Sequence, residues 1–110
     1  MELRRGAIVL AAGPGEYSRK PRPFLIVQSD IFNETHASVT LCPMTSNVGG
    51  ETLFRVPFAP SEATGLAGES EAQIDKVQSL RRERIVKLLG YAPATTMEQV
   101  DQALRRWLAL

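Results

Sequence analysis

Two short clusters of basic and hydroxyl side chains have the types and spacing that phosphate chemistry requires. The first is Arg19-Lys20-Pro21-Arg22-Pro23, in which the prolines on both sides bias Arg22 towards an extended backbone. An arginine held in this way can form a two-pronged hydrogen bond to a phosphate group. The second cluster is Pro43-Met44-Thr45-Ser46, whose neighbouring hydroxyls can bind an anion. Taken singly, each cluster is also compatible with an ordinary solvated turn.

The other reactive side chains exclude several kinds of site. His36 is the only histidine and Cys42 is the only cysteine, which excludes an intrachain disulfide, a cysteine-based zinc site and a His-rich metal site. The sequence contains no Walker loop, no GxGxxG motif and no HExxH motif. We expect His36 to lie in a solvated turn and Cys42 to be a small buried side chain. We therefore expect neither a metal ion nor another cofactor.

The elements that position the two clusters are predicted to be short strands. Each predicted strand is a short apolar run or an alternation of apolar and polar residues, bounded by turn residues. These segments are 7–11, 24–27, 37–42 and 52–58, and residues 71–80 have a strand-like middle. We expect residues 43–50 to form a loop because they contain Asn47 and a Gly-Gly pair. Residues 80–90 are compatible with either a short helix or a strand.

The last part of the chain changes to helical spacing. Thr95 and Thr96 are candidates for the N-cap, with Glu98 and Gln99 three residues later in a capping-box pattern. The apolar residues that follow at helical spacing are Met97, Val100, Leu104, Trp107 and Leu108. An amphipathic helix is therefore predicted to close over the core. The predicted fold is mainly β with a C-terminal α-helix, in which the strands form a strongly bent sheet or partial barrel.

Length and charge set further bounds. The 110 residues suit a single domain, 1–110, with enough apolar material for one core. Thirteen Lys and Arg residues against twelve Asp and Glu give a net charge of +1, so a nucleic-acid site would have to be a local basic patch. No apolar stretch approaches the ~18 residues that span a membrane. We expect a soluble, cytoplasmic protein.

Taken together, the motifs resemble those of the MazF/PemK toxin family, in the family's order and over nearly the whole chain. The segments that carry the resemblance are Arg5-Gly6-Ala7-Ile8-Val9, Arg22-Pro23-Phe24-Leu25-Ile26-Val27, Leu41-Cys42-Pro43-Met44-Thr45-Ser46, Val56-Pro57, Gly65-Leu66, Asp75-Lys76-Val77-Gln78-Ser79-Leu80 and the tail from Gly90 to Leu110. The family is known for sequence-selective endoribonucleases of toxin–antitoxin pairs. The resemblance implies an SH3-like barrel that forms a homodimer, binds a cognate antitoxin and cleaves single-stranded mRNA without metal or ribosome.

The resemblance also implies roles for individual residues. In such cleavage the ribose 2′-hydroxyl attacks the adjacent phosphorus and leaves a 2′,3′-cyclic phosphate and a 5′-hydroxyl. By resemblance, Arg22 would stabilise the phosphorane, Thr45 and Ser46 would hydrogen-bond the phosphate, and Asp75 would be the candidate base. Further RNA contacts are expected from Arg19, Lys20, Gln73, Lys76 and Arg81. Two of these depart from the family pattern, because Lys76 replaces a common glutamine and Gln73 a further arginine.

Two other functions remain open at the level of sequence. The first is a poison of DNA gyrase with the same fold, resembling the CcdB branch. That branch typically ends in a Trp-Gly-Ile-like tail, whereas this chain ends Trp107-Leu108-Ala109-Leu110. The second is a non-catalytic SH3-like module that binds RNA or protein. The Arg22-Pro23 and Thr45-Ser46 pairs favour the ribonuclease.

Overall fold

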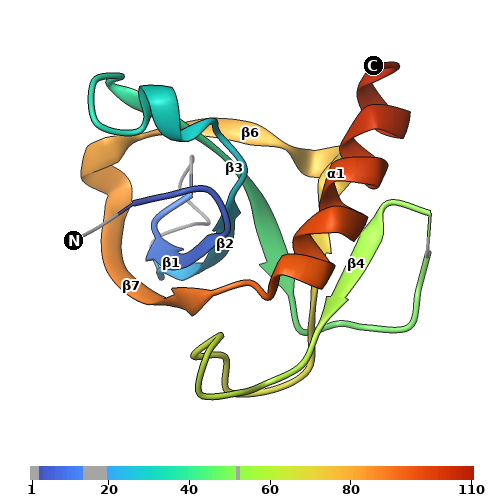
Figure 1. Cartoon of the computed structure of the whole chain (residues 1–110). Helices are drawn as coiled ribbons and strands as arrows, with labels where there is room; N and C mark the ends of the chain where they lie inside the picture. Colours follow the sequence, from blue (N-terminus) through green and yellow to red (C-terminus); the bar gives the residue numbers. More distant parts are fainter. Residues whose placement is uncertain (1–2, 14–19, 52) are drawn as a thin grey trace.

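The strands form one strongly bent antiparallel sheet, against which a single long helix packs (Figure 1). The computed structural model describes residues 3–13, 20–51 and 53–110. The elements in these ranges are β1 (Ala7–Ala11), β2 (Arg22–Ile26), η2 (Asp30–Phe32), β3 (Ser38–Thr45), β4 (Arg55–Phe58), β5 (Ser70–Gln73), η3 (Ile74–Lys76), β6 (Gln78–Arg81), η4 (Arg82–Arg84), β7 (Ile85–Tyr91) and α1 (Ala94–Leu108).

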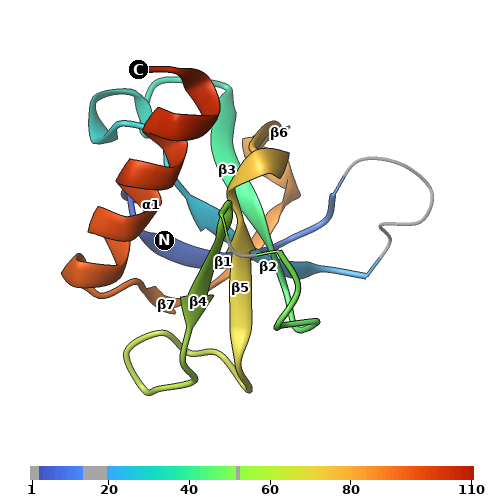
Figure 2. The same ribbon diagram turned by 90° about the vertical axis from the view of Figure 1, so that its right-hand side faces the viewer.

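The strand order confirms the predicted partial barrel. The order across the sheet is β4-β5-β3-β2-β1-β7, and β6 pairs with β3 beside β5. Within the described residues the two ends of this order do not pair, so the sheet is not closed into a full barrel. Figure 2 shows β4, β5 and β3 side by side, with α1 along the sheet formed by these strands. Residues 80–90, which the sequence leaves ambiguous, form the end of β6, η4 and most of β7.

Strand β3 produces the bend because it changes partner along its length. Its first half pairs with β6, up to Leu41 opposite Gln78, and its end pairs with β5, from Met44 opposite Ala72. The expectation that residues 43–50 form a loop is wrong at its start, since β3 continues to Thr45. Pro43 is tolerated there because it lies between the two partner strands, where no backbone N–H is required for the ladder.

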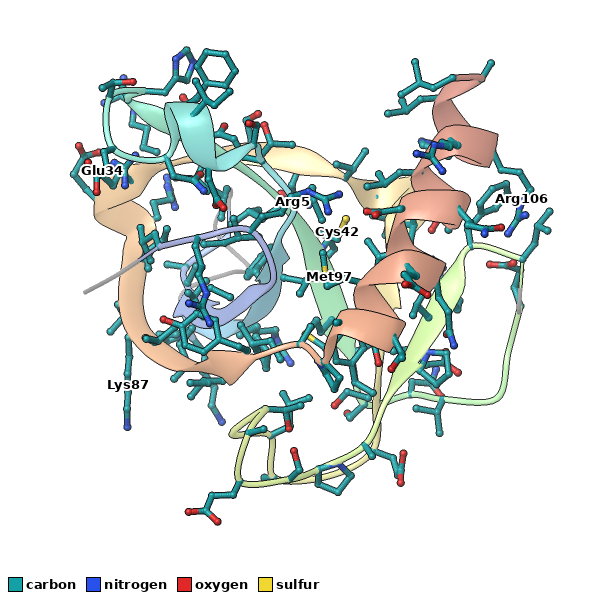
Figure 3. All side chains as sticks on the ribbon, in the orientation of Figure 1. Arg5, Glu34, Cys42, Lys87, Met97 and Arg106 are labelled. Atoms are coloured by element: carbon teal, nitrogen blue, oxygen red, sulfur yellow. The ribbon has the colours of Figure 1, made fainter. Side chains whose placement is uncertain are left out.

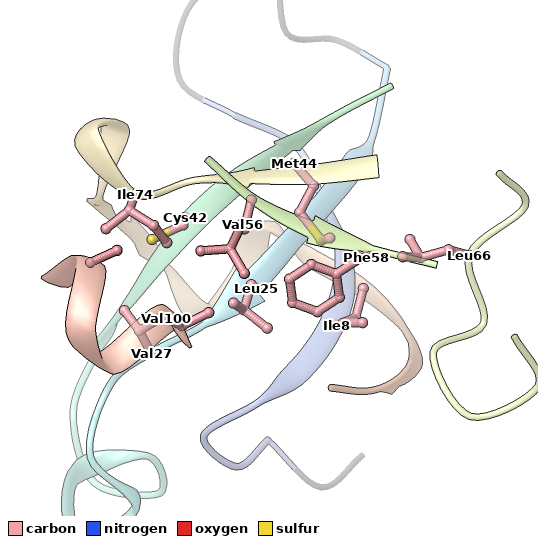
Figure 4. Close-up of a cluster of buried hydrophobic side chains, with 12 residues drawn as sticks. Ile8, Leu25, Val27, Cys42, Met44, Val56, Phe58, Leu66, Ile74 and Val100 are labelled. Atoms are coloured by element: carbon pink, nitrogen blue, oxygen red, sulfur yellow. The ribbon is translucent and has the colours of Figure 1, made fainter. Parts of the chain in front are cut away.

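Buried side chains lie on both faces of the sheet, so several strands are continuous apolar runs rather than alternating ones. The cluster beneath α1 contains Ile8, Leu25, Cys42, Met44, Val56, Phe58, Ile74 and Val100 (Figure 4). The second cluster contains Ala7, Val9, Ala11, Phe24, Ile26, Val39, Leu41 and Leu80. Because neighbouring residues of one strand belong to different clusters, each strand is fixed in position from both sides.

Helix α1 confirms the predicted C-terminal helix but begins differently. Its N-cap is Pro93, and no side chain caps it, so the predicted Thr95/Thr96 capping box is not formed. Proline suits a helix start because its φ is already near the helical value and it has no N–H to satisfy. Val100 is fully buried, whereas Trp107 at the far end is 46% exposed and packs edge-to-face on Phe54. The C-terminal end of the predicted apolar stripe, at Trp107 and Leu108, is thus only partly covered by the rest of the protein.

A half-buried arginine connects α1 to the sheet. The Nη2 atom of Arg5 lies 2.7 Å from Oδ1 of Asp101 on the helix, and its Nε donates to the carbonyl of Val27 at 2.9 Å (Figure 3). The same guanidinium therefore joins the start of the chain, the end of β2 and the middle of α1. None of the helices in the described ranges is long and apolar enough to span a bilayer.

Candidate active site

A cleft of about 500 Å³ lies where the start of β2 meets the end of β3 and the turn around η3. We call it the Arg22 cleft. Its polar side chains come from β2, β3 and its following residue, β5, η3 and β6: Arg22, Thr45, Ser46, Ser70, Gln73, Lys76 and Gln78. Most of the site residues predicted from the sequence are therefore brought together, although they are spread over more than fifty positions of the chain.

The pairing of β2 with β3 brings Arg22 of the first predicted phosphate-binding cluster close to Thr45 of the second. The antiparallel register sets Phe24 opposite Pro43 and Ile26 opposite Leu41. Continuing this register by two residues sets Arg22 opposite Thr45. Because side chains alternate between the faces of a strand, Arg22 and Thr45 lie on the same face as Phe24 and Pro43. All four of these residues line the cleft.

The charge of the Arg22 cleft is positive. Arg22 and Lys76 are both exposed, and neither side chain forms a hydrogen bond or an ion pair with any other residue in the described ranges. No carboxylate belongs to the described lining. Two free cationic groups without a neutralising partner attract an anion, and the fork of a guanidinium suits phosphate oxygens in particular.

Hydroxyl and amide groups complete the cleft. Thr45 Oγ1 accepts a hydrogen bond of 3.0 Å from the backbone N–H of Asn47, which leaves the hydroxyl proton free to donate to a ligand. Gln78 Nε2 donates to the carbonyl of Lys76 at 3.2 Å and so supports the chain beside the cleft. Ser70 Oγ donates to the carbonyl of Gly68 at 3.1 Å.

Ser70 and Gln78 are cleft residues that the sequence reasoning missed. Gln78 had a signal, because it follows Lys76 by two residues in a segment predicted to be a strand. Ser70 had none, since its place depends on the pairing of β5 with β3 and β4.

Asp75 lies outside the cleft lining, although Lys76 beside it is part of that lining. Its carboxylate is paired with the guanidinium of Arg55 on β4, and the two side chains are only 27% and 17% exposed. The strand-like middle expected for 71–80 is wrong, because residues 74–76 form the 3₁₀ turn η3. Successive side chains point about 120° apart in such a turn. Asp75 and Lys76 therefore face different surroundings.

The other predicted contacts are not brought together by the structure. Arg81 is exposed on β6 opposite Ser38 and does not line the cleft, nor does the exposed Lys20. Arg19 lies outside the described residues. Near Arg81, the guanidinium of Arg82 donates to the carbonyls of Asn33 and His36 and thereby holds the loop before β3.

Arg84 and Lys87 complete the basic stretch around η4. The guanidinium of Arg84 donates to the carbonyl of Gly13 at 2.8 Å, so its role in the structure is to hold the main chain beyond β1. The side chain of Lys87, on β7, extends away from the rest of the molecule (Figure 3).

Cys42 and His36 are where the sequence places them. The side chain of Cys42 is fully buried, and burial raises the pKa of its thiol to about 12; the nearby charge of Arg5 lowers this pKa and that of Asp75 raises it further. A thiol that stays protonated at neutral pH is a poor nucleophile. His36 is exposed. Within the described residues, no group of three or more His, Cys, Asp or Glu side chains is arranged to hold a metal ion.

Known proteins resemble this chain over nearly its whole length. Residues 4–108 match the profile of the family described as PemK-like, MazF-like toxin of type II toxin-antitoxin system. The chain belongs to this toxin family. It is 41% identical over 108 residues to the "Probable endoribonuclease MazF" of Mycolicibacterium smegmatis, and the match covers 98% of each chain.

Solved structures of the family share the fold. The complex described as "Endoribonuclease in complex with its cognate antitoxin from Mycobacterial species" has a TM-score of 0.80 at 23% identity and covers 99% of this chain and 97% of its own. A MazE-MazF crystal structure from Deinococcus radiodurans has a TM-score of 0.77 at 26% identity and covers 98% of this chain and 97% of its own. These matches confirm the predicted architecture of a bent sheet with one C-terminal helix.

Proposed function

We propose that this MazF/PemK-family protein is a sequence-selective endoribonuclease that cleaves single-stranded mRNA in the Arg22 cleft. The observation that carries the proposal is the meeting of Arg22 and Lys76, two cations with no partner among the described residues, with the hydroxyls of Thr45 and Ser46 in a cleft whose described lining has no carboxylate. The relatives named endoribonucleases support the enzyme class. This combination suits a phosphodiester, which carries negative charge and accepts several hydrogen bonds.

The proposed reaction is a transfer of the phosphodiester to the neighbouring hydroxyl. The ribose 2′-oxygen forms a bond to phosphorus while the bond from phosphorus to the 5′-oxygen breaks, which gives a 2′,3′-cyclic phosphate and a 5′-hydroxyl. Charge builds up on the phosphorane oxygens, where Arg22 stabilises it and the Thr45 hydroxyl donates a hydrogen bond, while Lys76 binds a phosphate of the RNA backbone. The 2′-hydroxyl loses its proton to solvent, and the 5′-oxygen takes one from solvent.

Arg22 acts in this scheme through charge and hydrogen bonds. An arginine side chain has a pKa above ~12 and is therefore a poor acid at neutral pH. Electrostatic stabilisation aimed at the developing charge is commonly the largest single contribution to catalysis. Asp75 is not used as the base, because its carboxylate is paired with Arg55 and lies outside the cleft lining.

A cognate antitoxin and a second copy of the chain are the proposed partners. The antitoxin complex of the mycobacterial endoribonuclease and the MazE-MazF structure support the first of these. An acidic, extended or helical segment of an antitoxin would compete with RNA for the positive Arg22 cleft. The proposed setting of this reaction is the cytoplasm, where mRNA is available, without a metal ion or other cofactor.

The experiment that tests the proposal is cleavage of a long single-stranded RNA by the purified protein in EDTA, with the fragment ends mapped. We expect discrete cuts within a short recognition sequence, cyclic phosphate at the 3′ side and a 5′-hydroxyl on the downstream fragment. A folded wild-type protein that leaves the RNA intact would refute the proposal. Inhibition of DNA gyrase by that protein would then support the poison, and RNA binding without cleavage would support the binding module.

A further inference from the structure

The turn η3 separates two charged neighbours in the sequence. Asp75 faces Arg55 of β4, whereas Lys76 lines the Arg22 cleft. A 3₁₀ turn of three residues has few hydrogen bonds of its own, and its one closing bond runs from the N–H of Val77 to the carbonyl of Ile74 at 3.2 Å. The direction in which Lys76 points therefore depends on what else holds the turn.

Phe54, which directly precedes β4, and Arg55, the first residue of β4, hold the turn η3 in place. The backbone N–H of Ile74 donates to the carbonyl of Phe54 at 2.9 Å, and the guanidinium of Arg55 pairs with the carboxylate of Asp75. Ile74 itself is fully buried in the cluster beneath α1. The Arg55 and Asp75 side chains are mostly shielded from water, at 17% and 27% exposed, so their attraction is screened less than that of a surface pair.

The Asp75 carboxylate acts electrostatically on the buried cluster beneath α1. Its charge acts on the buried thiol of Cys42, whose pKa it raises in addition to the larger effect of burial. Cys42 belongs to the same buried cluster as Ile74, and Figure 4 shows the two side chains together. Arg55 also lies 3.9 Å from Glu51, so the guanidinium joins two carboxylates on this side of β4.

We propose that Asp75 is a positioning residue rather than the proton acceptor: its ion pair with Arg55 fixes η3 so that Lys76 reaches an RNA phosphate in the Arg22 cleft. The inference rests on the proposed function and assigns roles in it to Arg55 and Lys76. Arg55 contributes to the active site by holding Asp75, without contacting RNA itself. Lys76 supplies a second cation beside Arg22 in the lining of the cleft.

The positioning role and the base role differ in what they predict for Arg55. A base must come within hydrogen-bond reach of the 2′-hydroxyl, whereas the Asp75 carboxylate is paired with Arg55 and lies outside the lining of the Arg22 cleft. If Asp75 were the base, removing Arg55 would free its carboxylate for the reaction. If Asp75 positions Lys76, removing either partner of the ion pair releases the turn in the same way.

The test compares Asp75→Asn, Arg55→Gln, their double variant and Lys76→Gln, in cleavage of a short RNA at several salt concentrations and over pH 5–9. For a single strand, one lost phosphate contact corresponds to about a fivefold rise in KM at 0.1 M salt, and it lowers the salt slope by about 0.7. We expect all four variants to show this change, with kcat and the pH profile close to those of the wild type. The KM of the double variant should be no higher than that of either single variant, because each single substitution already breaks the same Arg55–Asp75 ion pair.

The results that would overturn the inference are equally specific. A base role for Asp75 would give a loss of 10²–10⁴ in kcat for Asp75→Asn, of the order typical for a general base, with Arg55→Gln close to wild type. An unchanged salt slope in Arg55→Gln would also refute positioning. Should either single variant unfold, the charge-exchanged pair Arg55→Asp with Asp75→Arg decides: cleavage without a carboxylate at position 75 supports positioning, and loss of cleavage in the folded protein refutes it.

The wild-type protein in the same assay distinguishes this inference from the proposed function. If the wild type does not cleave RNA, the proposed function fails. If it cleaves and the Asp75 and Arg55 variants differ from each other, only the positioning role fails.

Discussion

Replacing Arg22 with alanine should remove RNA cleavage without affecting the fold. Arg22 is the first residue of β2 and lines the Arg22 cleft. Its side chain is exposed and has no hydrogen bond or ion pair to any other residue in the described ranges. An exposed side chain with no such partner contributes little to stability, so the free energy of unfolding should change by no more than about 0.5 kcal/mol. An effect on activity would therefore report on chemistry at the cleft.

The size of the loss follows from the role proposed for the guanidinium. Removing one preorganised donor from a site that stabilises a developing oxyanion costs about 10²–10³ in kcat, or about 2.7–4 kcal/mol. We expect Arg22→Ala to fall in or above this range, because the residue loses a charge as well as its hydrogen bonds. Arg22→Lys keeps the charge but loses the planar guanidinium, so its kcat should lie between those of the Arg22→Ala variant and the wild type.

The assay follows the initial cleavage rate of an RNA with one mapped site, together with thermal unfolding of each variant. Lys87→Ala is the matched control, because it removes an exposed cation that extends away from the molecule on β7 (Figure 3). We expect Lys87→Ala to cleave at the wild-type rate. A folded Arg22→Ala protein that cleaves as fast as the wild type would refute the assignment of the Arg22 cleft as the active site.

Three further predictions concern stability. Burial raises the pKa of Cys42 from 9.0 to about 12, so the contribution of the thiol to stability is complete below pH 9 and is lost between pH 9 and 12. The wild-type free energy of unfolding should therefore fall by about 1.4 kcal/mol per pH unit in this range because of Cys42. Thermal unfolding of Cys42→Ala over the same pH range should not show this decrease. A side chain on Gly90 would overlap the carbonyl of Ala63, so Gly90→Ala should lower the denaturation free energy by about 1–3 kcal/mol, whereas Gly50→Ala, with open space around it, should not. Arg5→Ala should cost about 1–3 kcal/mol in urea denaturation, because it leaves the carbonyl of Val27 without its donor; an unchanged midpoint would contradict the link between α1 and β2.

The family and the general architecture were predictable because they depend on local patterns. The apolar runs at 7–11 and 24–27 become β1 and β2 within two residues, since a short apolar segment between turn residues has few alternatives to a buried strand. The spacing of Met97, Val100 and Leu104 likewise specifies the buried side of α1. The motif order from Arg5 to the tail was sufficient to predict the toxin family, which the match over residues 4–108 confirms.

The candidate site was predictable in part. Arg22, Thr45, Ser46, Gln73 and Lys76 do line one cleft. Ser70 was missed because its position depends on which strands pair, and pairing joins segments that are distant in sequence. The N-cap was also mispredicted, since the capping-box pattern at Thr95 competes with Pro93, whose ring has already fixed the entry to the helix.

The sequence by itself determined the first two strands, the C-terminal helix and the residues that could bind phosphate, because these depend on side-chain identity and spacing over a few positions. Only the tertiary structure decided that β3 continues through Pro43, since that requires β6 to end and β5 to begin on the same side of the strand. It alone also decided that Asp75 meets Arg55 while Lys76 enters the cleft. The physical reason is that such contacts join residues twenty or more positions apart, and no local period encodes which of two adjacent charged side chains will find a partner across the fold.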